Sequence, residues 1–246
     1  MEKTLVIVPT YNERENLPRM VQRLLSLPVS VDMLIVDGNS KDGTGALADE
    51  LVAKHPQVHV LHQKAKNGLG PAYISGFQWA LEHDFEFIFE MDSDFSHNPD
   101  DIPSFIDAAK KQDADLVLGS RYVGGIRVIN WPLKRLFLSR FAGKYVKTVT
   151  GMPFTDPTGG YKCFRRRALQ ALNFDKIQCR GYGFQIELTN KLWRQGFKVV
   201  EVPIIFTERT YGQSKMAGGI INEAFWLVWR LWLQNGLRRS PRVRNS

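Results

Sequence analysis

Short apolar runs alternate with helix-like segments over the first half of this sequence. The runs are Leu5–Val8, Met33–Val36, Val58–Leu61, Phe85–Phe89 and Leu116–Leu118. Continuous runs of this kind are typical of parallel strands that are covered on both faces. From Leu17 to Leu25 the apolar residues recur at helical spacing, and helices also fit residues 42–54, 70–82 and 100–111. Repeated strand–helix units predict an α/β fold, with a doubly wound, mixed but mostly parallel sheet and helices on both faces.

The alternation weakens beyond residue 125. The stretch "NWPLKRLFLSRFAGKYVKTVTG" predicts a basic amphipathic helix, "TDPTGGYKCF" a turn entering a strand, residues 182–195 a helix, and "KVVEVPIIF" a further strand. We expect residues 1–215 to form one catalytic-type α/β domain. Residues 216–246 are expected to add a C-terminal amphipathic helix and a basic tail.

The apolar centre of that last helix, from Ala224 to Leu233, is interrupted by Arg230. It is much shorter than the roughly 20 residues that span a bilayer. Three tryptophans with flanking arginines fit a helix that lies in the membrane interface, although packing on the core or on a second subunit would explain them equally well. The N-terminal apolar run is too short for a signal peptide. The sequence therefore predicts a peripheral protein on the cytoplasmic side of a membrane, with a membrane-anchoring subunit or a second copy as further candidate partners.

The charge balance points to an anionic partner. The chain of 246 residues has 33 basic and 25 acidic residues, a net charge of +8, and four arginines in its last nine residues account for half of that excess. Phosphorylated molecules and acidic membrane surfaces fit this charge. Nucleic acid is disfavoured because no aromatic RNA-binding pattern and no zinc spacing accompany it. Cys163 and Cys179 form no metal-binding pattern and fit a reducing compartment.

Polar residues follow four of the predicted strands directly. They are "PTYNE" after the first, "DGNSKDGT" after the second, "DSDFSHNP" after the fourth and "GSRY" after the fifth. Parallel strands bring their carboxyl ends to one edge of the sheet, and ligands of doubly wound folds bind beyond that edge. We therefore expect one binding site there.

Asp92 and Asp94 follow the fourth strand and lie one residue apart. Two carboxylates so close together repel each other unless solvent, an arginine or a metal ion compensates. A hard divalent cation bound to a diphosphate often takes only one or two protein carboxylates. Such a cation would neutralise both the aspartates and a leaving diphosphate.

The ends of the first two strands suit a nucleoside. Asp37 can accept hydrogen bonds from a ribose or base, although an acid there could instead contribute to capping the next helix. Tyr11 offers an aromatic face and Glu13 an acceptor, beside Pro9. Neither a GxGxxG fingerprint after the first strand nor a GxxxxGK[ST] loop is present in the sequence, so dinucleotide-binding and P-loop sites are not expected.

Basic side chains follow in the second half. Arg121 comes after the fifth strand, Arg135 and Ser139 share a helix face at a spacing of four, and the loop "ERTYGQSK" contains Arg209 and Lys215. Arginine forms bidentate contacts with phosphate, so these residues suit an anionic substrate.

Taken together, these residues resemble the family-2 glycosyltransferases of GT-A fold and, within them, the polyprenol-phosphate (dolichol-phosphate) mannosyltransferases. The motifs that carry the resemblance are "VPTYNERENL", "IVDGNSKDGT", "NGLGPAYISGF", "MDSDFSHNP", "GSRYVGG", "NWPLKRLFLSR", "DPTGGYKCF", "GYGFQIEL" and "ERTYGQSKM". Ser93 departs from the alanine that is usual in that family, and the C-terminal transmembrane pair of some members does not occur in this sequence.

The resemblance implies a role for each candidate residue. The nucleotide sugar would be bound by Pro9, Tyr11, Glu13, Val36, Asp37, Asp92, Ser93, Asp94, Arg121, Arg209 and Lys215. The phosphate of the lipid acceptor would be bound by Arg121, Arg135 and Ser139. Asp92 and Asp94 would hold Mg²⁺ or Mn²⁺, with Asp94 as the direct ligand, and with Arg121 and Arg135 they would form the catalytic set.

The implied reaction is inverting transfer of a hexose, most commonly mannose from GDP-mannose, to a polyprenyl monophosphate. UDP-glucose as donor and a saccharide hydroxyl as acceptor remain alternatives, and a hydroxyl acceptor would need a general base such as Glu187. A binding protein without catalytic activity is the alternative of another class. The set Asp37, Asp92, Asp94, Arg209 and Lys215 argues against it, because a scaffold needs no metal site.

Overall fold

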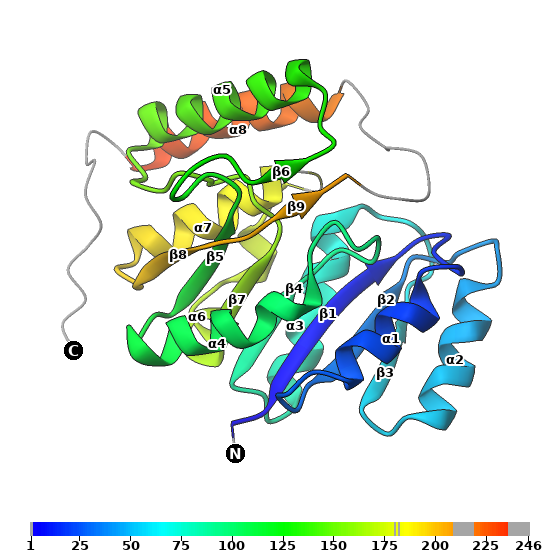
Figure 1. The fold of residues 1–246 in the computed structure, drawn as a ribbon. Helices are drawn as coiled ribbons and strands as arrows, with labels where there is room; N and C mark the ends of the chain where they lie inside the picture. The colour runs from blue at the N-terminus through cyan, green and yellow to red at the C-terminus, as the bar shows by residue number, and fades with distance from the viewer. Residues whose placement is uncertain (1, 180, 182, 209–218, 236–246) are drawn as a thin grey trace.

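A seven-stranded sheet forms the centre of the molecule (Figure 1). The computed structural model describes residues 2–179, 181, 183–208 and 219–235. Along the sheet the order is β3-β2-β1-β4-β7-β5-β8. The strands are β1 (Thr4–Thr10), β2 (Asp32–Asp37), β3 (Val58–His62), β4 (Phe87–Glu90), β5 (Leu116–Ser120), β7 (Lys162–Arg165) and β8 (Val199–Pro203). Only β7 pairs antiparallel with its neighbours, β4 and β5, so the expected mixed but mostly parallel sheet is confirmed.

Helices cover both faces of this sheet, as the apolar runs predict. One face packs on α1 (Leu17–Leu25), α2 (Thr44–Lys54) and α4 (Ile102–Lys111), and the core there includes Met20, Ala48 and Phe105. The other face packs on α3 (Leu69–Glu82), α6 (Arg166–Gln170) and α7 (Gly183–Arg194), around Phe77, Leu169 and Leu188. Single turns of 3₁₀ helix, η1 (Pro99–Asp101) and η2 (Phe174–Lys176), precede α4 and α7.

Two long helices lie side by side at one end of the molecule, α5 (Leu133–Thr150) and α8 (Gly219–Asn235) (Figure 1). Leu227, Val228 and Leu231 of α8 are buried in the same core as α7, whereas Trp226 and Leu233 are exposed. Of the two interpretations of this helix, packing on the core therefore applies to one of its faces. No helix within the described residues is long and apolar enough to cross a membrane. The proposed division at residues 215 and 216 stays a prediction.

The stretch "KVVEVPIIF" is not one continuous strand. It divides into β8 and a short β9 (Phe206–Thr207), which pairs in parallel with β6 (Val128–Ile129) in a separate two-stranded sheet. Pro203 lies at the end of β8 and has no N–H to donate, which disfavours continuation of a hydrogen-bonded ladder. This small sheet carries the chain from the central sheet towards α5.

The carboxyl ends of β1, β2, β4 and β5 all point to one edge, because these strands run parallel to one another. The polar segments that follow them therefore meet, as predicted. β3 ends at the same edge and adds the segment from Gln63 to Gly68. The pairing of strands thus places every predicted strand-end segment around one site.

Candidate active site

A cleft of about 370 Å³ lies along this edge of the sheet. The predicted residues that line it are Pro9, Tyr11, Glu13, Val36, Asp92, Ser93, Asp94, Arg121 and Arg135. The sequence did not single out other lining residues, among them Gln63, Lys66, Asn67, His97, Thr158, Gly160, Gln185 and Phe206. Arg209 and Lys215 lie outside the described residues.

At one end of the cleft, Tyr11 presents an aromatic ring close to a cation. The Lys66 ammonium lies 4.1 Å from the centre of that ring. Glu13 follows Tyr11, and Val36 lines the cleft from the end of β2. An aromatic face, a carboxylate and an ammonium together suit a base and its attached phosphates.

Asp37 lies beneath this end and is buried. Its carboxylate accepts hydrogen bonds from Thr10 Oγ1 at 3.2 Å and from Ser40, through the hydroxyl at 2.6 Å and the backbone N–H at 3.1 Å. These contacts tie the end of β2 to the end of β1. In the turn before α2, the carboxylate of Asp42 accepts a hydrogen bond from the backbone N–H of Thr44 at 3.0 Å. Capping therefore does not explain Asp37, and its role in holding a nucleoside remains a proposal.

The Asp92–Asp94 loop lines the middle of the cleft. Asp94 Oδ1 accepts from the Ser96 N–H at 3.0 Å and from the Ser96 hydroxyl at 2.6 Å, which fixes the carboxylate against its own turn. Among the described residues, no group of three or more His, Cys, Asp or Glu side chains is placed to hold a metal ion. Two adjacent carboxylates match a hard cation that takes its remaining ligands from a diphosphate and water.

His97 supports this loop from below. Its Nδ1 accepts the backbone N–H of Asp92 at 3.2 Å, and its ring stacks on Tyr161 with the ring centres 4.9 Å apart. Burial lowers the pKa of His97, although the charges of Asp92 and Asp94 act in the opposite direction. The accepted hydrogen bond and the lowered pKa both indicate a neutral imidazole, which holds the backbone of the Asp92–Asp94 loop without adding charge.

Two buried ionisable side chains, Glu90 and Lys162, lie under the floor of the cleft. Glu90, the last residue of β4, is paired in register with Lys162 of β7, and Lys162 Nζ donates to the backbone oxygen of Gln185 at 2.7 Å. Burial raises the pKa of Glu90 to about 7, with the Lys162 charge opposing it. Burial also lowers the pKa of Lys162 to about 8. Lys162 compensates part of the negative charge gathered under Asp92.

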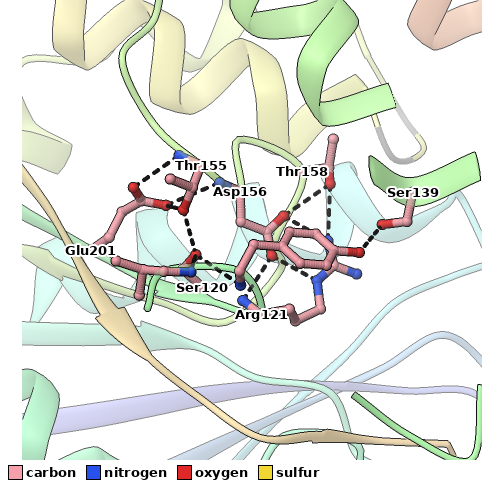
Figure 2. A network of polar contacts seen from close by, with 9 residues as sticks. Ser120, Arg121, Ser139, Thr155, Asp156, Thr158 and Glu201 are labelled. Carbon is pink, nitrogen blue, oxygen red and sulfur yellow. Dashed lines mark hydrogen bonds and ion pairs between the residues drawn. The ribbon is translucent and has the colours of Figure 1, made fainter. Parts of the chain in front are cut away.

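At the other end of the cleft, Arg121 is locked to the buried Asp156 (Figure 2). Arg121 Nε and Nη2 donate to the two carboxylate oxygens at 2.6 Å and 2.7 Å, and Nη2 also donates to Thr158 at 2.9 Å. Burial alone would raise the pKa of Asp156, but the charge and hydrogen bonds of Arg121 lower it below the usual value. Arg121 therefore lines the cleft as a cation whose orientation is fixed by Asp156 and Thr158.

Arg135 lines the same end from α5. Its guanidinium lies 4.2 Å from the ring centre of Trp131 and pairs with Glu208, the last described residue before 209–218. Ser139 accepts a hydrogen bond at 2.7 Å from Oη of Tyr122, the residue that follows Arg121 (Figure 2). The structure thus brings the three predicted acceptor residues to one end, with the two arginines in the cleft wall and Ser139 bonded behind them.

Glu187 is turned away from the cleft. Its Oε2 accepts the backbone N–H groups of Gln178 and Cys179 at 3.2 Å and 3.1 Å, and its carboxylate pairs with Lys191 at 3.3 Å. Arg230 of α8 lies 3.9 Å from it. These contacts support a structural role. The residue that α7 presents to the cleft is Gln185, which the motif "GFQIEL" contains but which periodicity alone did not separate from Glu187.

Comparison with known proteins places this chain in a family. The model of Glycosyl transferase family 2 matches residues 5–172. The chain therefore belongs to glycosyltransferase family 2, and it is a glycosyltransferase.

Two curated relatives are similar over nearly the whole chain. One is a polyprenol monophosphomannose synthase of Mycolicibacterium smegmatis, 47% identical over 98% of this chain and 91% of the relative. The other is an undecaprenyl-phosphate mannosyltransferase of Micrococcus luteus, 46% identical over 90% of each chain. The predicted resemblance to family-2 enzymes of the polyprenol-phosphate mannosyltransferase type is thus confirmed.

Solved structures show the same fold at low sequence identity. A glucosyl-3-phosphoglycerate synthase from Mycobacterium tuberculosis, in complex with Mn²⁺, UDP-glucose and phosphoglyceric acid, has a TM-score of 0.69 at 16% identity, covering 94% of this chain and 80% of that one. A mannosyltransferase from Pyrobaculum calidifontis, in complex with GDP-mannose and Mn²⁺, has a TM-score of 0.59 at 13% identity, covering 95% and 70%. The fold is therefore the expected GT-A fold.

Proposed function

We propose that this enzyme transfers mannose from GDP-mannose to a polyprenyl monophosphate, forming a β-linked mannosyl phosphopolyprenol. The observation that carries the proposal is the composition of the acceptor end of the cleft. Two arginines, Arg121 and Arg135, line it, and the α7 side chain that lines the cleft is Gln185, whereas the Glu187 carboxylate is bonded to backbone N–H groups outside it. The names of the two curated relatives support the same acceptor class.

The chemistry follows from an acceptor that is already ionised. The second pKa of a phosphate monoester is about 6, so its oxygen is a nucleophile at pH 7 without a general base. That oxygen forms a bond to C1 of the sugar while the bond from C1 to the diphosphate oxygen breaks. Attack from the opposite side converts an α-linked donor into a β-linked product. Arg121 and Arg135 orient the nucleophile, which is the positioning part of catalysis.

Asp92 and Asp94 would hold a divalent cation, Mg²⁺ or Mn²⁺, which when bound neutralises the charge that develops on the leaving diphosphate. Two solved structures of similar fold contain Mn²⁺, and the adjacent carboxylates of this chain fit such an ion. At the other end Pro9, Tyr11, Glu13, Val36 and Asp37 would position the nucleoside. Ser93 would contribute through its backbone, and Arg209 and Lys215 would close over the diphosphate.

Two enzymatic alternatives differ in substrate. UDP-glucose is the donor in one of the structures of similar fold, and a ring such as Tyr11 accepts purines and pyrimidines alike. A saccharide hydroxyl as acceptor would need a general base, and the contacts of Glu187 with two backbone N–H groups argue against that residue.

Removal of the Arg135 guanidinium tests the acceptor assignment. Arg135→Ala should raise the KM for polyprenyl phosphate by about tenfold or more, because a charge-assisted hydrogen bond contributes about 1.5–3 kcal/mol. The KM for the nucleotide sugar should change much less. Steady-state kinetics with each substrate varied in turn measures the difference. Arg19→Ala, which removes an exposed charge from α1, serves as control. An equal rise in both KM values would contradict the assignment.

We further propose that α5 rests on an anionic membrane surface. Leu133, Phe137 and Phe141 recur at a spacing of four on this helix, and each is 70% exposed. The helix also contains five basic and no acidic residues. Exposed aromatics among basic side chains suit the membrane interface. Because Arg135 lies on the same helix, docking there would bring the lipid phosphate to the acceptor end of the cleft.

The double variant Phe137→Ser/Phe141→Ser should bind vesicles at least about tenfold more weakly, since each phenylalanine contributes about 1.5–3 kcal/mol when buried. Co-sedimentation with vesicles that contain anionic lipid measures this. Turnover of a short-chain, water-soluble polyprenyl phosphate should be retained, because the cleft is unchanged. Undiminished vesicle binding would rule out the α5 surface as the docking site.

A further inference from the structure

Four polar side chains are buried together beneath the cleft floor, each from a different element. They are Tyr73 of α3, Glu90 of β4, Lys162 of β7 and Gln185 of α7, and none is more than 1% exposed. We call them the floor cluster. The described residues supply no hydrogen-bond partner of normal geometry to Tyr73 Oη, to either Glu90 oxygen or to the amide atoms of Gln185. Buried polar atoms are almost always satisfied, so this concentration of exceptions indicates a missing partner.

Within the floor cluster, Gln185 is the residue that reaches the cleft. It lies in the first turn of α7, and its backbone oxygen is fixed by Lys162 Nζ at 2.7 Å. A Cβ at Gly160 would lie 3.8 Å from Gln185 Nε2 and 3.6 Å from His97 Cε1, so Gly160 is next to both side chains. Gly160, His97 and Gln185 all line the cleft, which places Gln185 at the cleft wall.

The floor cluster lies next to the loop that would hold the diphosphate. Glu90 is two residues before Asp92 and is paired in register with Lys162, whose Nζ donates to the Gln185 backbone oxygen at 2.7 Å. These contacts place the first turn of α7 next to the end of β4. A group attached to a diphosphate at Asp92 would therefore be close to Gln185.

We propose that Gln185 hydrogen-bonds the hydroxyl groups of the hexose being transferred and so helps to determine which sugar the enzyme accepts. This rests on the proposed function, since it presupposes a nucleotide-sugar donor. A primary amide can donate to one hydroxyl and accept from another, which matches neighbouring hydroxyls on a pyranose ring. The amide neither gains nor loses a proton at neutral pH, so it can hydrogen-bond the sugar hydroxyl groups without proton transfer.

The test is Gln185→Met, which keeps the length of the side chain and removes its hydrogen bonds. Calorimetric titration with Mn²⁺ present should give the same affinity for GDP, within about twofold. In the same titration, without acceptor, the affinity for GDP-mannose should fall at least about tenfold, the effect of losing one hydrogen bond of about 1.4 kcal/mol. Gln195→Met, just beyond α7 and exposed, makes the same exchange outside the cleft.

A measurement of thermal unfolding distinguishes a role of Gln185 in sugar recognition from a role in stabilising the fold. Within the described residues the Gln185 amide interacts with the Glu90 carboxylate but makes no hydrogen bond of normal geometry, so the Tm of Gln185→Met should change by less than about 2 °C. A purely structural glutamine, or one satisfied by a trapped water alone, predicts a larger fall in Tm and no selective effect on the sugar. Should Gln185→Met fail to fold, Gln185→Asn shortens the same amide and is judged by the same ratio of sugar to nucleotide effects.

Donor analogues that each lack one hydroxyl complete the test. If Gln185 contacts a given hydroxyl, removal of that hydroxyl from the donor and the Gln185→Met exchange should have non-additive effects on the free energy of donor binding. For the other hydroxyls the two effects should add. Additivity at every hydroxyl, or an equal weakening of GDP and GDP-mannose binding, would overturn the proposal. Donor binding is measured without acceptor, so a wild-type enzyme that binds GDP-mannose but does not glycosylate polyprenyl phosphate would overturn the proposed acceptor and leave this test intact.

Discussion

Asp94→Asn should reduce transfer by about 10³-fold or more while the protein remains folded. The exchange keeps the shape of the side chain, and the new amide oxygen can still accept the two hydrogen bonds from Ser96. It removes the negative charge that would bind the divalent cation. Loss of electrostatic stabilisation at a leaving group has an effect of this size.

Initial rates with saturating GDP-mannose and polyprenyl phosphate, at rising Mg²⁺ and Mn²⁺, measure the effect of Asp94→Asn. Asp107→Asn is the matched control, because it makes the same exchange on an exposed residue of α4. Near-normal activity of Asp94→Asn with added metal would contradict the metal assignment. A large decrease in the Tm of Asp94→Asn would instead show that Asp94 has a structural role.

Asp156→Asn is expected to destabilise the fold by about 3–5 kcal/mol, the range for breaking one partner of a buried ion pair. The Asp156 side chain is 0% exposed and that of Arg121 12%, so the arginine would keep a charge that little solvent reaches. The amide can replace some hydrogen bonds but not the charge. Urea denaturation measures the loss, and a change below about 1 kcal/mol would contradict the proposed importance of the pair.

The pH dependence of this loss has a defined direction. The pKa of Asp156 is lowered in the folded state, so the unfolded state binds more protons and the pair stabilises the fold above the unfolded value of 3.8. That stabilisation disappears as the pH falls through the lower pKa of the folded state. The difference between wild type and Asp156→Asn should therefore be constant at neutral pH and shrink below about pH 4. A difference that is largest in acid would exclude the ion pair as its cause.

The binding edge could be predicted from the sequence because its signals are local. Each apolar run and the polar segment behind it are adjacent in the chain, so parallel pairing alone brings Tyr11, Asp92 and Arg121 to one cleft. Asp37 is a partial exception. It closes β2 as expected, but its hydrogen bonds to Thr10 and Ser40 are contacts that only the register of β1 and β2 could reveal.

Other parts of the site depend on long-range pairing, which a single sequence does not encode visibly. The insertion of β7 between β4 and β5 places Lys162 beside Glu90, 72 positions earlier in the chain. The Arg121–Asp156 pair likewise joins residues 35 apart. On α7, Gln185 and Glu187 are both polar and nearly adjacent, and only the packing of the helix decides which one faces the cleft.

The central claim is mannosyl transfer to a lipid phosphate, and the product tests it most directly. The purified protein should be incubated with polyprenyl phosphate, Mg²⁺ or Mn²⁺ and a panel of nucleotide sugars that includes GDP-mannose and UDP-glucose. Mass spectrometry of the lipid fraction should show one added hexose with GDP-mannose, and NMR of that product should show a β-anomeric phosphodiester. A lipid unchanged in mass with every donor, or transfer only to a saccharide hydroxyl, would contradict the claim.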